Sequence, residues 1–88
     1  MRAQHSNDPE ALALAALAWT LGEEGRAQRF LALTGLDPES LRARIAEPSV
    51  LAAALGFLEA HEPDLLAAAE AIGASPAELV EARRRLEG

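Results

Sequence analysis

Two long runs of the sequence contain no polar residue. They are Ala11–Trp19 and Val50–Leu58, and both consist mainly of alanine and leucine, which are strong helix formers. A helix that is apolar on every side is buried on most of its surface or lies in an interface. Gly56 lies inside the second run at a cost of about 0.5–1 kcal/mol relative to alanine, for which a close helix crossing would be a reason. We therefore expect two buried central helices.

The other apolar residues recur at helical spacing, on one face of shorter segments. In the segment 26–34, Arg26 and Arg29 are predicted to point outward. The residues predicted to point inward there are Phe30, Leu31 and Leu33. The stripe predicted to be buried in 64–72 is Leu65, Leu66, Ala69 and Ile72. The helix that starts at Pro38 has an apolar edge formed by Leu41 and Ile45. The helix that starts at Pro76 is predicted to point Leu79 and Leu86 inward. With helices at 9–21 and from Pro48, the pattern predicts an all-α chain.

Proline and glycine mark the ends of these helices. All five prolines stand at predicted helix starts, where the missing N–H of the ring has no consequence. Gly22, Gly35 and Gly73 stand at predicted helix ends, where glycine commonly adopts a left-handed backbone. The predicted N-caps include Asp8, Asp37 and Ser75, the last in an S-x-x-E capping box with Glu78.

One corner between helices occurs twice. The stretch Phe30–Leu41 reads FLALTGLDPESL, and Ala68–Leu79 reads AAEAIGASPAEL. In the first copy, Leu36 is placed to contact Leu31 in a Schellman arrangement and Leu41 in a hydrophobic staple. A shift of 38 residues aligns the two corners and also aligns the two apolar runs.

This repetition defines the predicted organisation. We expect a polar, frayed tail at 1–8 and a single domain at 9–88, with pseudo-repeat halves at 9–46 and 48–87. The domain would be a compact bundle of five to six short helices, built from two three-helix units. Two copies are too few for an open solenoid, so the halves are expected to pack on each other.

The runs RFLALTGLDPESLRARI and FLEAHEPDLLAAAEAIGASPAEL resemble a small bacterial family that is known only as a domain of unknown function. The resemblance extends from about Leu12 to Leu86, and FLALTGLDP is its most specific piece. It implies a small helical bacterial protein. It implies no activity, ligand or catalytic residue.

Composition and charge exclude several classes of function. The 88 residues include no cysteine and no lysine, so disulfides, thiolate chemistry and Schiff-base chemistry are excluded. The net charge of −6 disfavours nucleic acid and anionic membranes as partners. The longest apolar run falls short of the ~20 residues of a membrane span, and the N-terminus lacks the apolar core of a signal peptide. We expect a cytoplasmic protein.

The sequence offers no complete catalytic, cofactor or metal site. Ser75 is used as a cap, and no histidine is placed by the sequence to activate a serine. His61, Glu62 and Asp64 form the single cluster of histidine with carboxylates, but a metal ion would need further converging ligands. His5, the other histidine, lies in the predicted tail. We therefore expect no enzyme, no cofactor and no bound metal.

Two functional hypotheses follow. The first is a non-catalytic protein–protein interaction or adaptor module, acting through an unidentified partner or through self-association as a homodimer. The residues proposed to take part in it are Trp19, Arg83, Arg84 and Arg85. The alternative is a nucleic-acid-binding helix-turn-helix regulator that uses the helix after Gly35 or, with the better fit, the helix after Gly73. Acidic residues such as Glu39 and Glu78 near the starts of the recognition helices disfavour this alternative.

Overall fold

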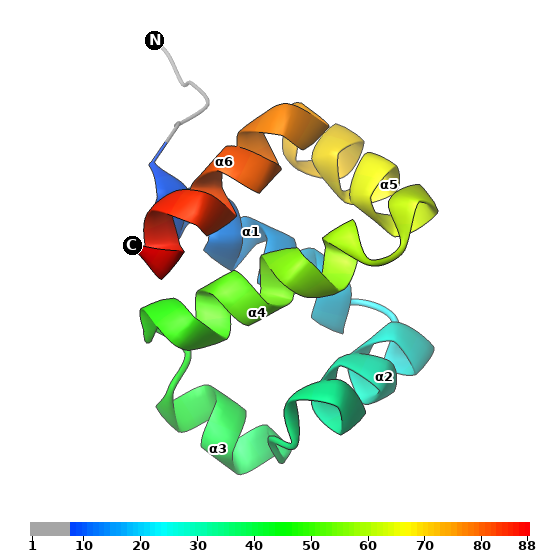
Figure 1. Ribbon diagram of the computed structural model, residues 1–88. Coiled ribbons are helices and arrows are strands. Elements are labelled where there is room, and N and C mark those ends of the chain that lie inside the picture. Colours follow the sequence, from blue (N-terminus) through cyan, green and yellow to red (C-terminus); the bar gives the residue numbers. More distant parts are fainter. Residues whose placement is uncertain (1–7) are drawn as a thin grey trace, which may run out of the picture.

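Six helices account for most of residues 8–88, which are the residues that the computed structural model describes (Figure 1). They are α1 (Pro9–Leu21), α2 (Glu24–Thr34), α3 (Pro38–Ala43), α4 (Pro48–Glu59), α5 (Glu62–Ile72) and α6 (Pro76–Glu87). Residues 8–88 contain no strand, so the all-α prediction is confirmed. His5 and all of the predicted tail except Asp8 lie outside the described residues.

The core is built mainly by α1, α4 and α6. In Figure 1, α4 crosses the middle of the molecule, with α5 and α6 on one side and α2 and α3 on the other. Both apolar runs supply fully buried leucines, among them Leu17 in α1 and Leu51, Leu55 and Leu58 in α4. The prediction of a buried central helix is confirmed for α4. The burial of α1 is one-sided, however, because Leu14 faces solvent.

The two halves of the chain do not pack alike. The helix α3 has 6 residues and lies at the edge of the molecule, whereas α6 has 12 residues and packs against both α1 and α4. Corresponding corners do share a left-handed glycine, because Gly35 and Gly73 have φ angles of 74° and 78°. The core therefore combines helices from both halves, and the repeat is clearest at the corners.

The predicted caps are present. Asp8 and Asp37 accept hydrogen bonds from the backbone N–H groups of Ala11 at 2.9 Å and Ser40 at 2.7 Å. The capping box of α6 is complete, with distances of 2.8 and 3.1 Å between Ser75 and Glu78. All five prolines lie at the first or second position of a helix.

The helix ends at the three glycines differ from one another. Gly22 is not left-handed, because its φ is −75°, so that prediction was wrong. At Gly35 the N–H donates to the carbonyl oxygen of Leu31 at 2.9 Å, while the N–H of Leu36 donates to the hydroxyl of Thr34. The Schellman arrangement predicted there is therefore absent. It occurs instead at Gly73, where Ala74 N–H donates to the carbonyl of Ala69 at 2.9 Å.

Two helices begin earlier than predicted. The carboxylate of Glu23 accepts from Arg26 N–H at 2.8 Å and acts as a cap, so α2 starts at Glu24 and includes Gly25. The predicted start was Arg26. Likewise α5 starts at Glu62, before Pro63, and the capping position is His61.

The predicted buried stripe of α5 was partly wrong. Leu66 is 49% exposed, whereas Ala68 and Ala69 are buried. These alanines lie on the side of α5 that faces the core, where short side chains let the helices approach closely. Leu66 therefore projects to solvent.

Gly56 is not required by a tight helix crossing. A Cβ atom added there would lie 3.8 Å from Cδ of Arg83, which is an ordinary van der Waals distance. The close crossing expected from the sequence was therefore wrong, and the neighbour of Gly56 is the stem of an arginine side chain from α6.

The acidic caps make the fold sensitive to low pH. Hydrogen bonds from the N–H and hydroxyl of Ser40 lower the pKa of Asp37 below its ordinary value of 3.8. Because its pKa is lower in the folded state, the ionised Asp37 stabilises the fold above pH 3.8. This stabilisation is lost as the pH falls through the pKa of the folded state. We expect Asp37→Asn, which keeps a capping oxygen, to unfold less steeply below pH 4 than the wild type. Circular dichroism between pH 2 and pH 6 measures this, and an unchanged acid transition would contradict it.

Candidate interaction surface

Both the ring and the carbonyl group of Trp19 contact Arg26 within the fold. The guanidinium of Arg26 lies 3.6 Å from the centroid of its ring, and Nη2 of Arg26 donates to the carbonyl oxygen of Trp19 at 2.6 Å. Arg26 was predicted to point outward, but its side chain is only 18% exposed. The carbonyl of Trp19, which also accepts from the N–H of Gly22 at 3.1 Å, lies in the last turn of α1, where the negative end of the helix dipole attracts a cation. Trp19 and Arg26 thus join α1 to α2.

The three consecutive arginines of α6 point in different directions. Arg83 donates to Glu59 of α4 at 2.5 Å and to Glu87 at 2.7 Å. Both hydrogen bonds raise the pKa of Arg83, and the one to Glu59 has the larger effect. Arg84 is exposed and lies 3.9 Å from Glu81, and Arg85 is exposed beside a small hollow. Arg83 therefore links α6 to α4, whereas Arg84 and Arg85 face the solvent.

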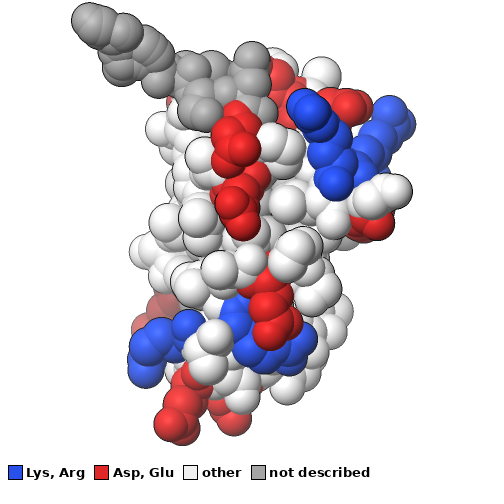
Figure 2. Space-filling view, turned by 90° about the vertical axis from the view of Figure 1, so that its left-hand side faces the viewer, with Lys and Arg blue, Asp and Glu red and all other residues white. Residues whose placement is uncertain are grey.

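Charges of both signs lie side by side on this part of the surface. Figure 2 shows the face at the left of Figure 1, where basic side chains form separate groups, each next to acidic side chains. A nucleic acid is bound most readily by a continuous basic surface. The helix-turn-helix alternative is untested and stays a prediction.

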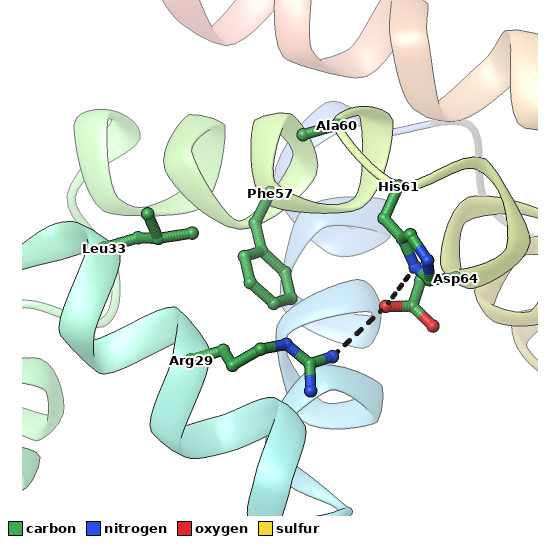
Figure 3. Close-up of a pocket in the computed structure, with 6 residues that line it drawn as sticks. All are labelled: Arg29, Leu33, Phe57, Ala60, His61 and Asp64. Carbon is green, nitrogen blue, oxygen red and sulfur yellow. Dashed lines mark ion pairs between the residues drawn. The ribbon is translucent and has the colours of Figure 1, made fainter.

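Two hollows lie along the boundary of α2 and α4. One has a volume of about 420 Å³ and is lined by Arg29, Leu33, Phe57, Ala60, His61 and Asp64 (Figure 3). The other has a volume of about 320 Å³ and is lined by Leu33, Thr34, Leu36, Arg44, Ser49, Val50 and Ala53. Leu33 lines both. We call the two hollows together the α2–α4 groove.

The packing of two aromatic rings explains the groove. Phe30 of α2 is fully buried, and its ring meets the ring of Phe57 edge-on, with 5.6 Å between centroids. This contact holds α2 against α4 through one side of α2. Arg29 and Leu33, which are four residues apart and thus neighbours on the helix, lie beside it at the rim (Figure 3).

Leu33 is the most exposed large apolar side chain in residues 8–88, at 75%. The sequence predicted it to point inward, and that was wrong. Phe30 occupies the inward direction of α2, so Leu33 projects between the two hollows. On α4, the lining residues Val50, Ala53, Phe57 and Ala60 recur every three or four positions and form one stripe.

A polar group of three side chains closes one end of the groove. Oδ2 of Asp64 lies 3.1 Å from Nδ1 of His61 and 3.6 Å from Nη2 of Arg29 (Figure 3). Asp64 is mostly buried, whereas the other two side chains are exposed. The surface at this end therefore presents a guanidinium and an imidazole above a buried carboxylate.

This group differs from the cluster read in the sequence. His61 and Asp64 meet as neighbours, while Glu62 does not line the hollow. Arg29 was missed, because it lies on another helix and no local pattern links it to Asp64. Within residues 8–88, no three histidine and carboxylate side chains converge as metal ligands would.

Comparison with known protein families identifies the family of this chain. The family model described as "Protein of unknown function (DUF3572)" matches residues 6–88. The chain belongs to the DUF3572 family. This match confirms the resemblance found in the sequence, and its description assigns no activity to the DUF3572 family. No curated protein and no solved structure matches the chain. Among residues 8–88 of this DUF3572 protein, no helix has the length and apolarity of a membrane span.

Proposed function

We propose that this DUF3572 protein is a non-catalytic protein–protein interaction module of the bacterial cytoplasm, and that the α2–α4 groove is its docking surface. The observation that carries this proposal is the exposure of Leu33 between two hollows. Burying a leucine side chain is worth about 1.5–3 kcal/mol, and a single exposed leucine is ordinary on a protein surface. Here the leucine lies next to Ala53 and Phe57 of α4, which are partly exposed, so the apolar surface continues from α2 onto α4.

Charge favours a different protein over a second copy as the partner. Arg29 lies at one end of the groove and Arg44 at the other. If two grooves faced each other on a two-fold axis through Leu33, each arginine would meet either its own copy or the other arginine. Like charges in contact oppose association. A homodimer formed through this groove is therefore disfavoured.

Site-specific photocrosslinking tests the docking surface. We expect a photoreactive amino acid in place of Leu33 to crosslink a discrete partner in cells that naturally express the protein. The same amino acid in place of Ala71, an exposed residue of α5 outside the groove, serves as the matched control and is expected to give no such product. Excess unmodified protein should compete the product away. Absence of a product at Leu33, or equal products at both positions, would refute the proposal.

A further inference from the structure

The geometry of the α2–α4 groove points to one class of ligand. We propose that it binds an amphipathic helix of another protein, which carries a carboxylate side chain near each end of a short apolar ridge. This inference rests on the proposed function and deepens it by naming the chemistry of the partner.

The length of the groove sets the length of the ridge. The stripe on α4 runs from Val50 to Ala60, and ten helical steps of 1.5 Å span about 15 Å, or about three turns. A helix laid along it would place an apolar residue in each hollow. Leu33 stands between the hollows, so the residue of the ligand that faces it is expected to be small. The apolar ridge of the ligand is therefore expected to carry a large side chain, then a small one, then a second large one.

The arginines at the two ends of the groove favour a ligand helix with an acidic side chain near each end of its apolar ridge. The side chain of Arg29 is 58% exposed and that of Arg44 is 45% exposed. Among residues 8–88, Arg29 has one ion pair, at 3.6 Å to the mostly buried Asp64, and Arg44 has one, through Nε to Glu47 at 2.9 Å. A guanidinium has five N–H donors, so both arginines keep donors for a second carboxylate. At the Arg29 end, the exposed His61 adds a further polar contact.

Other occupants fit less well. A phosphate backbone would bring closely spaced charges over Leu33 and the apolar stripe, where they would be desolvated without partners. A second copy of this chain would bring arginine against arginine. A helix with acids at both ends satisfies the apolar centre and both cations at once, as in other complexes in which an amphipathic helix fills a groove.

A selection from displayed helices tests the inference. The probe is a phage-displayed library of alanine-based helical peptides, randomised at the positions of one face, and the bait is the full chain. We expect the retained peptides to be enriched in Asp or Glu at two positions about eleven residues apart, which is three turns and therefore the same face of a helix. In a retained peptide, changing either acid to its amide should weaken binding about tenfold, as for other charge-assisted hydrogen bonds.

Variants of the bait assign each acid to its arginine. Arg29→Gln is expected to abolish the acidic preference at one end only, and Arg44→Gln at the other end only. Arg84→Gln, which removes an exposed arginine of α6 outside the groove, should leave both preferences intact. Circular dichroism checks that each variant remains folded.

Three outcomes would overturn the inference. They are retained peptides without acidic preference, acidic preferences that persist in both groove variants, and no retention above the level of a Leu33→Asp bait. If crosslinking at Leu33 still succeeds in any of these cases, only the chemistry assigned to the partner is wrong. If crosslinking fails as well, the proposed function falls with it.

Discussion

Phe30→Ala is expected to lower the free energy of unfolding by about 3–5 kcal/mol, the usual cost of removing a buried aromatic side chain. Phe30 is fully buried and heads the largest such side chains in residues 8–88. Its ring is the edge-on partner of Phe57, and the truncation would leave a cavity between α2 and α4. A domain of this size has a total stability of roughly 5–10 kcal/mol. The loss would therefore remove a large part of it.

Urea unfolding monitored by circular dichroism measures this loss. The matched control is Leu33→Ala, three residues along the same helix, where we expect a change within about 0.5 kcal/mol because the side chain is exposed. Phe30→Leu, which retains much of the buried volume, should remain folded and lie between the two. A loss below about 1 kcal/mol for Phe30→Ala would contradict the packing described for α2.

Alanine substitutions at three glycines are expected to differ in sign. Gly35→Ala and Gly73→Ala should each destabilise the fold by about 1–2 kcal/mol, because both glycines have left-handed backbones that alanine adopts only with strain. A Cβ atom would meet nothing within 4 Å at either position, so the cost comes from the backbone alone. Gly56→Ala should instead stabilise the fold by about 0.4–1 kcal/mol, because helical geometry suits alanine and its Cβ would make only an ordinary van der Waals contact with Arg83.

Thermal unfolding measures the three variants together. For a domain of this length, 1 kcal/mol corresponds to a shift of roughly 4–8 °C in Tm, so the two corner variants and Gly56→Ala should move to opposite sides of the wild type. If Gly56→Ala lowered Tm as much as the corner variants, the loose contact described between Gly56 and Arg83 would be wrong.

The sequence predicted well the features that depend on neighbouring residues. Caps such as Asp37 and Ser75, and the left-handed glycines at two corners, are decided within a few positions by hydrogen bonds and backbone sterics. Both apolar runs were also placed in the core, because a helix apolar on all sides leaves few other arrangements. The helical class and the order of the elements follow from these features.

The candidate site was not predictable in the same way. Leu33 and Phe30 both suit the inward side of α2, and only the position of the Phe57 ring decides which of them is buried. Arg29 reaches Asp64 from another helix, and Arg26 turns back onto Trp19. These contacts depend on how the helices are placed relative to one another. Helical periodicity gives the apolar side of each segment and leaves that placement open.

The packing of α6 against α1 has a consequence for synthesis of the chain. Helix α1 is the first of the six to leave the ribosome and α6 is the last, yet both are needed to enclose α4. Until α6 emerges, the apolar faces of α1 and α4 lack their main cover, and exposed apolar surface is what chaperones recognise and what aggregates. We infer that the domain completes its core late, because a large share of the contacts between its helices involves the final helix.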